Sequence, residues 1–309
     1  MDKSRVEWKT LALLGACYAL WALGTTWLFA LWAPLGFVIT VVMIGLHSSL
    51  THEMVHGHPF RSEIANEAIM LPCLGLFVPF RRFRDLHLAH HVDSRLTDPY
   101  DDPESNFQDP AVWVLLPRWV QVMLRVHNTL AGRMLLGPAL GVYSLVRDDL
   151  RLIRQGDGAV RLAWLLHLPG VALVLAWVVL SPIPFWAYLI AAYMAWSLIK
   201  IRTFLEHRAH ERASGRTVVI EDTGFFALLF LNNNYHVVHH MHPKVAWYDL
   251  PRMFRNNREK YLSRNDGYYY RSYAEIFRKH FLRAKDPVPH PLMAEGPLPE
   301  NAEVKIPAE

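Results

Sequence analysis

Histidine is the residue type best suited to metal chemistry in this chain, and most of its 17 histidines fall in four places. The first is HEMVHGH at residues 52–58, where His52 and His56 are four residues apart. Residues at i and i+4 of a helix share one face, so these two imidazoles can bind one metal ion. With Glu53 beside them, the same HExxH pattern is how a zinc protease holds its ion. The other histidines decide between a protease and a larger, histidine-only centre.

Two further groups, HLAHH (87–91) and HVVHH (236–240), share a second spacing, HxxHH. On a helix this spacing also places three imidazoles on one face. Two separate copies of this spacing are hard to obtain by chance. A fourth group, FLEHRAH, contains His207 and His210. We call HxxxH the first box, HLAHH the second and HVVHH the third. The second and third boxes contain His87, His90, His91, His236, His239 and His240.

The number of ligands argues against a protease. A zinc protease uses two histidines and a third ligand, and leaves one position open for water. The boxes supply two, three and three imidazoles, and His207 makes nine. One ion cannot use nine ligands, whereas two ions with four or five ligands each can. Imidazole suits iron, zinc and copper alike, so the pattern predicts a two-metal centre without naming the metal.

Two long stretches without charge must position these groups. No Asp, Glu, Lys or Arg occurs in the 37 residues 10–46 or in the 38 residues 162–199. A membrane span needs about 20 apolar residues, so each stretch has room for two spans. Turns are expected at LWAPLG (31–36) and SPIP (181–184). Such uniform lack of charge is rare in water-soluble helices. We therefore expect two hairpins of transmembrane helices, over residues 11–30, 34–50, 162–180 and 184–200.

Basic residues flank both hairpins and are absent from their tips. By the positive-inside rule, this places both termini and the large loops in the cytoplasm. All four histidine groups can then meet at the cytoplasmic face. We expect an all-α integral membrane protein whose cytoplasmic helical cap carries the boxes. The flanking residues are Lys3, Arg5, Lys9, Arg81, Arg82, Arg84, Arg147, Arg151, Arg154, Arg161, Lys200, Arg202, Arg208 and Arg212.

Composition excludes several other functions. The net charge of +4 follows from this topology and does not require nucleic-acid binding. With only Cys17 and Cys73, no disulfide framework, Cys-ligated zinc or iron–sulfur cluster is expected. The spans nearly lack polar ligands, which argues against a metal transporter. We expect one membrane domain over residues 1–285 and a disordered Pro-rich tail over 286–309. Glu53, Asp85, Asp98, Asp101 and Asp102 could each accept an imidazole N–H from a metal-bound histidine. The acidic stretch 93–105 is nevertheless expected to be mostly a solvated loop.

The boxes, in this order and separated by paired spans, resemble the membrane-bound fatty acid desaturase and hydroxylase superfamily. The similarity covers residues 10–255, and its most specific part is an asparagine run before HVVHH, then Pro243 and WYDLP (247–251). Those asparagines could bind a metal-bound water or cap the helix of the third box. Members are non-haem di-iron enzymes that activate O₂ and attack an unactivated C–H bond. The resemblance implies two irons. It also implies nine catalytic, metal-binding histidines: His52, His56, His87, His90, His91, His207, His236, His239 and His240. His210 is the alternative to His207 as the ninth ligand.

The resemblance also implies a lipid-like substrate, most simply a fatty acid that is desaturated, and a bacterial inner membrane. Two motifs, HGHPFR after the first box and WYDLP, are more similar to those of bacterial hydrocarbon and carotenoid oxygenases than to those of ordinary acyl-CoA desaturases. Two other redox outcomes therefore stay open. They are hydroxylation or ketone formation on a hydrocarbon or carotenoid, and decarboxylation of a fatty acid to a terminal alkene. An intramembrane zinc protease is the alternative outside redox chemistry.

Electrons must come from another protein, because the sequence contains no cytochrome b5 motif, flavin fingerprint or cysteine cluster. The implied partner is a ferredoxin, rubredoxin or cytochrome b5 type donor with its reductase. Residues 244–285 contain 11 Lys and Arg against 4 Asp and Glu, a net charge of +7. This segment could attract an acidic donor. The positive-inside rule would produce the same excess.

Overall fold

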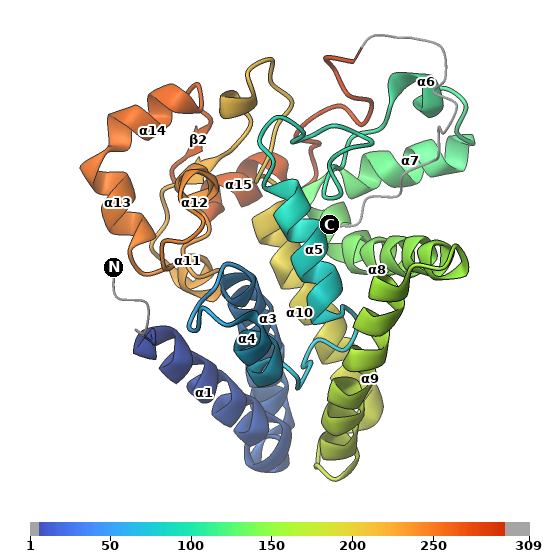
Figure 1. The fold of residues 1–309 in the computed structure, drawn as a ribbon, viewed down its shortest axis with the longest axis vertical. Coiled ribbons are helices and arrows are strands. Elements are labelled where there is room, and N and C mark those ends of the chain that lie inside the picture. Colours follow the sequence, from blue (N-terminus) through green and yellow to red (C-terminus); the bar gives the residue numbers. More distant parts are fainter. Residues whose placement is uncertain (1–5, 294–309) are drawn as a thin grey trace. The chain divides into compact units, whose positions relative to one another are not determined.

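The computed structural model describes residues 6–293 and is built mostly of helices (Figure 1). The chain divides into two compact units, which we describe separately. The first unit contains Met1–Asp85, Asp149–Ile199 and Leu229–Leu231. The second contains Leu86–Asp148, Lys200–Leu228 and Asn232–Glu309.

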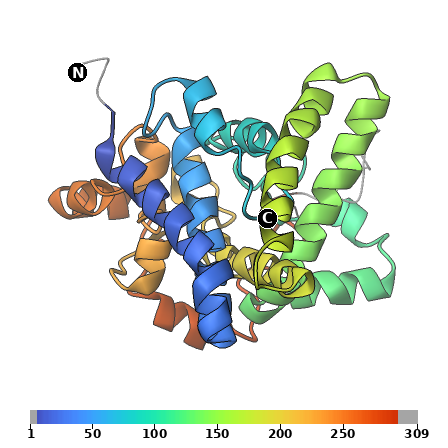
Figure 2. The same cartoon turned by 90° about the horizontal axis from the view of Figure 1, so that it is seen from below.

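The first apolar stretch forms a helical hairpin in the first unit. α1 (Trp8–Leu23) continues through one π-helical turn, η1 (Gly24–Leu28), into the short α2 (Phe29–Leu31). α3 (Ala33–Val55) runs back beside α1 in both Figures 1 and 2. α3 extends past the predicted end of the second span, so that His52 lies within the helix and His56 follows its last residue.

The reversal of this hairpin is one residue long and lies in LWAPLG, as predicted. Trp32 has an extended backbone, with φ of −156°. Pro34 lies in the first turn of α3, where the N–H that proline lacks has no helical partner in any case. Gly36 faces the neighbouring helix so closely that a Cβ would lie 2.5 Å from backbone atoms of Phe29. Glycine is therefore required at this close approach.

The second apolar stretch forms α9 (Gly158–Val179) and α10 (Phe185–Thr203). The carboxylate of Asp157 begins α9 by accepting hydrogen bonds from the backbone N–H groups of Ala159 and Val160. The SPIP turn lies between the two helices. A helix therefore occurs at each of the four places that the lack of charge predicts.

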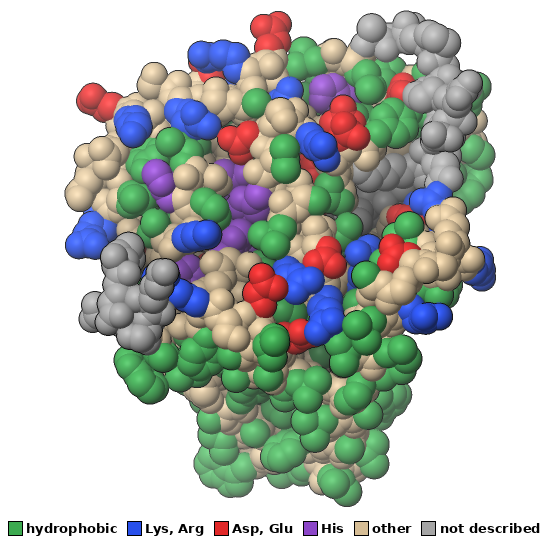
Figure 3. Space-filling view, viewed as in Figure 1, with side chains coloured by type: hydrophobic (Ala, Val, Ile, Leu, Met, Phe, Trp, Pro, Cys, Tyr) green, Lys and Arg blue, Asp and Glu red, His purple; other side chains and the backbone are tan. Residues whose placement is uncertain are grey.

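Three helices among the described residues are long and apolar enough to span a membrane: Trp8–Leu31, Ala33–Val55 and Gly158–Val179. Large apolar side chains such as Trp27 and Leu165 are more than half exposed on them, which is expected for surfaces that face lipid. Figure 3 shows almost only hydrophobic side chains in the lower part of the view, where Figure 1 draws these helices.

The fourth predicted span, residues 184–200, is helical but is not among these three. α10 has 19 residues and carries Lys200 and Arg202 in its last turn, which shortens its apolar part. A fourth candidate span exists if α7 (Arg118–His127) and α8 (Leu130–Arg154), which are bent by 115°, are counted as one. The predicted class, a helical integral membrane protein, is confirmed with three or four candidate spans.

A buried ion pair lies in the core of the first unit. Arg82 belongs to α5 (Phe80–His90), and its side chain is 10% exposed, while that of Asp149 is 1% exposed. Nε of Arg82 lies 2.9 Å from both carboxylate oxygens of Asp149. The indole N–H of Trp164 donates to Oδ2 of Asp149 at 2.8 Å. The charge of Arg82, which we counted among the flanking basic residues, is thus neutralised inside the protein.

The second unit holds most of the short helices, together with most of α8, and one feature that the expected all-α fold did not include. Val219–Ile220 (β1) and Tyr269–Tyr270 (β2) pair as two short parallel strands. Its core contains Val219, Tyr235, Val237, Val238, Leu250, Phe254 and Tyr261. Besides α7 and α8, its helices include α6 (Pro110–Trp113), η2 (Ala213–Gly215), α11 (Phe225–Leu229), α12 (His236–Met241), α13 (Leu250–Asn256), α14 (Arg258–Arg264) and α15 (Tyr273–His280). The short helix α4 (Glu63–Ile69) belongs to the first unit.

The first residues of the predicted tail lie within the described part of the chain and contact Gln108. Val288 is buried, and its carbonyl accepts a hydrogen bond from the backbone N–H of Gln108 at 2.9 Å. The carbonyl of Gln108 accepts from the N–H of His290 at 2.8 Å. The proline-rich composition did not reveal this apolar anchor at Val288. The rest of the predicted tail, 294–309, lies outside the described residues.

Candidate metal centre

Seven of the nine predicted ligands lie in the second unit, where they form two groups. α5 presents His87 and His90, and His91 follows its last residue. α12 presents the third box, and its Val237 and Val238 are buried in the core of the unit. The four-histidine group consists of His90, His207, His236 and His240, and the three-histidine group of His87, His91 and His239.

One nitrogen of each ring in the four-histidine group faces the others, and all four lie within 4.8 Å of one another. Nε2 of His207 lies 2.8 Å from Nε2 of His90 and 3.2 Å from Nε2 of His236. Two nitrogens bound at right angles to one ion, each about 2.1 Å from it, are about 3 Å apart. The spacing therefore suits nitrogens that share one metal ion.

The outward nitrogens of three of these four rings are oriented by oxygen atoms. Nδ1 of His90 donates to Asp102 at 2.8 Å. Nδ1 of His236 donates to the amide oxygen of Asn233 at 3.1 Å, and Nδ1 of His240 lies 3.4 Å from Asp93. Metal-bound histidines almost always donate their second N–H in this way, which fixes the ring and makes it a better ligand.

Protonation also suits the four-histidine group to a metal. Burial, and then the neighbouring imidazoles, hold the pKa of His207 and of His236 well below the usual value, and burial also lowers the pKa of His240. These rings are therefore neutral near pH 7, as metal ligands must be. Nε2 of His240 is buried and has no hydrogen-bond partner among residues 6–293. A bound ion would satisfy this atom.

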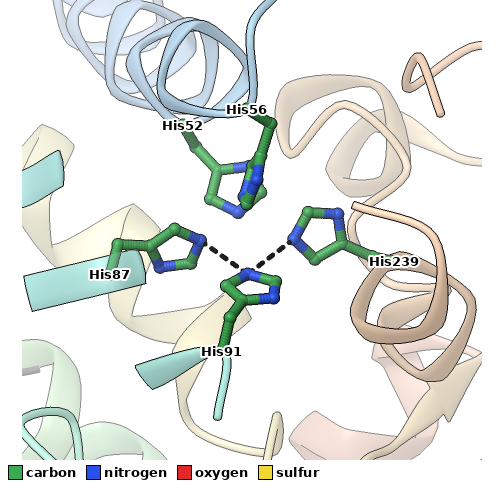
Figure 4. A group of neighbouring side chains, drawn as sticks. All are labelled: His52, His56, His87, His91 and His239. Carbon is green, nitrogen blue, oxygen red and sulfur yellow. Dashed lines mark hydrogen bonds between the residues drawn. The ribbon is translucent and has the colours of Figure 1, made fainter. Parts of the chain in front are cut away.

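The three-histidine group has the same construction. Nε2 of His91 lies 3.0 Å from Nε2 of His87 and 3.2 Å from Nε2 of His239. Figure 4 shows both contacts, with His91 between the other two rings. Nδ1 of His87 points outward and donates to Glu104 at 3.1 Å. Three inward nitrogens are one short of the four ligands usual for a bound transition metal.

The first box lies in the first unit, at the end of α3. The ring centroids of His52 and His56 are 5.0 Å apart, as expected for positions i and i+4 on one face. Figure 4 also draws these two side chains. His52 is buried, and its Nδ1 lies 3.8 Å from Glu53. The box therefore has the predicted helical form.

His210, the rival of His207, is outside both groups. Its Nε2 lies 3.1 Å from Asp266, and its Nδ1 accepts from the backbone N–H of Arg212. α10 ends at Thr203, and the segment that follows it, which contains His207, is hydrogen-bonded to other residues of the second unit. The N–H of Val218, for example, donates to the carbonyl of Glu206 at 3.1 Å. This segment brings His207 to the four-histidine group.

Comparison with known proteins agrees with this geometry. A family model described as "Fatty acid desaturase" matches residues 25–273, well over half of the chain. The chain belongs to the fatty acid desaturase family. No curated relative matched it. Members of the family are di-iron oxidoreductases, so the chain is a membrane-bound enzyme of this class, and HEMVH is not a protease motif.

The sequence offered Asp102 and Asn233 as candidate polar groups near the metal site but did not single them out. Asp102 is 1% exposed, although the acidic stretch 93–105 was expected to be a solvated loop. Its carboxylate is held by the backbone N–H groups of Thr97 and Glu104. Asn233 does not cap α12, whose N-cap is Tyr235, and its amide oxygen instead orients His236. Their polar type and their position beside the second and third boxes made them candidates, but the sequence could not show which of them would be buried against a histidine.

A cavity of about 250 Å³ lies within the first unit, and most of its lining is apolar. α3 lines it with Ile44, His47, Ser48 and Thr51. His52 lies one helical turn beyond Ser48 on the same helix, a rise of about 6 Å. Side chains from α4, α5, α9 and α10 complete the lining, among them Ile64, Phe83, Leu166, Ala195 and Trp196.

Proposed function

We propose that the protein is an O₂-dependent di-iron oxidoreductase that removes hydrogen from an unactivated C–H bond of a fatty acid or lipid-like chain, most simply to desaturate it. The observation that carries this proposal is the four-histidine group. Its Nε2 atoms converge, while Asp102, Asn233 and Asp93 hold the outward nitrogens of three of the rings. Such a site can hold a redox-active ion firmly inside the protein.

The proposed ligand set contains nine histidines and two irons. The four-histidine group holds one ion. His52 and His56 join the three-histidine group around the other, because three imidazoles leave that ion short of ligands. The first box supports this assignment with two imidazoles on one helix face, of which His52 is buried. Bound iron would supply the electron transfers that reduce O₂ and oxidise the substrate.

The cavity in the first unit is the proposed binding site for the acyl or hydrocarbon chain. Its lining includes two charged side chains, Glu67 and Arg81, which pair at 2.6 and 2.9 Å. The lining therefore offers no net charge to an anionic group, and suits the methylene part of a substrate. Ser48 on α3 and Phe83 on α5 each precede a ligand by four residues, namely His52 and His87. A bound chain would thus lie about one helical turn from the metal ligands.

The three redox outcomes share this site and the same electron requirement. Desaturation with one O₂, two electrons and two protons gives an alkene and two waters. Hydroxylation gives an alcohol and one water, and decarboxylation gives a terminal alkene, CO₂ and two waters. The outcomes differ in how the substrate is placed against the oxidant, by about an ångström.

We propose that the two electrons come from an acidic ferredoxin, rubredoxin or cytochrome b5 type donor with its reductase, at the cytoplasmic face of a bacterial inner membrane. Lys244, Arg252, Arg255 and Lys260 are exposed in the segment that follows the third box. Their charge supports docking of an acidic protein. Arg252→Glu combined with Arg255→Glu should raise the KM for such a donor, most strongly at low salt, and leave the iron content unchanged.

The first experiment is expression with a ferredoxin and its reductase, followed by analysis of extracted lipids and headspace volatiles. His236→Ala is the inactive control. A lipid that lacks two hydrogens supports desaturation, one that gains oxygen indicates hydroxylation or ketone formation, and an alkene one carbon shorter indicates decarboxylation. Purified protein should contain iron. Zinc in place of iron, with no O₂-dependent product, would refute the proposal.

A further inference from the structure

Glu104 stands between the two histidine groups of the second unit and contacts both. Its side chain is 7% exposed. Oε1 lies 3.1 Å from Nδ1 of His87, in the three-histidine group. Oε2 lies 3.2 Å from Nε2 of His90, in the four-histidine group. The backbone N–H of Glu104 donates to Asp102 at 2.9 Å, which fixes the start of the side chain.

The two contacts differ in chemical character. Nδ1 of His87 is an outward nitrogen, because Nε2 of the same ring faces His91. Oε1 of Glu104 therefore orients a ligand from behind. His90 presents its other ring nitrogen to Glu104. Its Nδ1 donates to Asp102, and its Nε2 is the atom that faces His207. Oε2 thus approaches His90 from the side on which the metal would bind.

Metal binding changes what Oε2 can contact. Once Nε2 of His90 donates its lone pair to an ion, that nitrogen has no proton and cannot donate to Glu104. The 3.2 Å between the two atoms then equals the distance between neighbouring ligands of one ion. A carboxylate oxygen at that distance is attracted to the ion itself.

We propose that Glu104 is a metal ligand, through Oε2, in the four-histidine group, while its Oε1 holds His87 in the other group. This inference rests on the proposed two-metal function. The ligand set of one ion becomes four imidazoles and one carboxylate. One anionic side chain then lowers the net charge of that ion's site and ties the position of one group to the other.

A small cavity of about 30 Å³ beside Glu104, Asp102 and His207 provides the competing arrangement. A space of this size can hold a water molecule. Glu104 would then accept from a metal-bound water and would not be a ligand. Because Glu104→Gln could disturb either arrangement, the test must distinguish them by distance.

The test compares wild type, Glu104→Gln, Glu104→Ala and Asp102→Asn, each loaded with ⁵⁷Fe. Asp102→Asn is the matched control, since it changes the orientation of His90 without removing a proposed ligand. Mössbauer spectra of Glu104→Gln should show one altered iron site and one that is unchanged. Glu104→Ala removes both the proposed ligand and the oxygen that orients His87, so it should bind both irons more weakly, at least one of them by about 10-fold or more under chelator dialysis. Glu104→Gln decides the matter if Glu104→Ala does not fold.

A structure of the iron-loaded wild type provides the direct measurement. Oε2 of Glu104 about 2.0–2.2 Å from an iron would support the inference. A separation above about 3 Å with a water between them, or iron signals unchanged in both Glu104 variants, would overturn it and leave the proposed function intact. Wild-type protein that binds no pair of irons would overturn both.

Discussion

Nε2 of His90 lies 2.8 Å from Nε2 of His207, although 117 positions separate the two residues in the chain. Asp102 accepts from the other nitrogen of His90, so the nitrogen that faces His207 carries a lone pair. Two imidazoles that meet in this way compete for one proton, and a metal ion can replace it. This contact joins the second box to the segment after α10, which no local spacing connects.

His207 and His210 form a matched pair for testing the ninth ligand. His207→Ala removes a nitrogen from the four-histidine group and should weaken one iron site by about 10–100-fold, with loss of product. His210→Ala breaks an exposed contact with Asp266 and should keep both irons and most activity. Iron content after dialysis and product formation measure both effects. Equal loss in the two variants would contradict the assignment of His207.

Loss of the ion pair between Arg82 and Asp149 should lower the free energy of unfolding more than loss of an exposed ion pair on the same helix. Asp149→Ala leaves a nearly buried guanidinium without its partner and should cost about 3–5 kcal/mol. Asp148→Ala is the neighbouring control, because its pair with Arg147 is about one third exposed and should cost less than about 1 kcal/mol. Thermal unfolding in detergent measures both. The double variant Arg82→Met/Asp149→Leu should recover most of the loss, and equal costs for Asp148→Ala and Asp149→Ala would contradict this account.

The cavity can be tested by filling it. Ala195→Phe on α10 places a ring in the space proposed for the substrate chain, and should lower turnover of long-chain substrates about 10-fold or more without loss of iron. Ile190→Phe enlarges a side chain on the same helix that is 47% exposed and does not line the cavity, so it should change little. Product yield for substrates of different length, normalised to iron, gives the answer. An unaffected Ala195→Phe enzyme would place the substrate elsewhere.

The buried imidazoles also predict how the metal-free protein responds to acid. The pKa values of His207, His236 and His240 are lowered in the folded state. Below pH of about 6.5 the unfolded chain therefore binds protons that the folded chain does not, and stability falls as pH decreases. Each histidine contributes up to about 1.4 kcal/mol per pH unit.

Melting temperatures of the apo-protein between pH 7.5 and 5.5 test this dependence. The triple variant His207→Gln/His236→Gln/His240→Gln should show a flatter profile, because glutamine does not titrate. Iron-loaded wild type should hold its melting temperature to lower pH, since the ion competes with protons for the same nitrogens. Parallel profiles for wild-type apo-protein and the triple variant would show that other groups control the acid response.

The sequence by itself determined the features that depend on local spacing. Lack of charge over residues 10–46 and 162–199 predicted helices at four places, and HxxxH and HxxHH predicted rings on single helix faces. These predictions need only the helical repeat and the cost of charge in a bilayer. Recognition of the family followed from the same motifs.

Only the tertiary structure decided which atoms lie behind and between those rings. In the sequence, Asp102 and Asn233 were candidates without a defined partner, Glu104 looked like an ordinary loop residue, and Arg82 looked like one more basic flank. Their roles depend on contacts across long stretches of chain, such as that of His90 with His207 and that of Arg82 with Asp149. A carboxylate becomes an orienting group or an ion-pair partner only when folding removes it from water, and burial of that kind has no local sequence pattern.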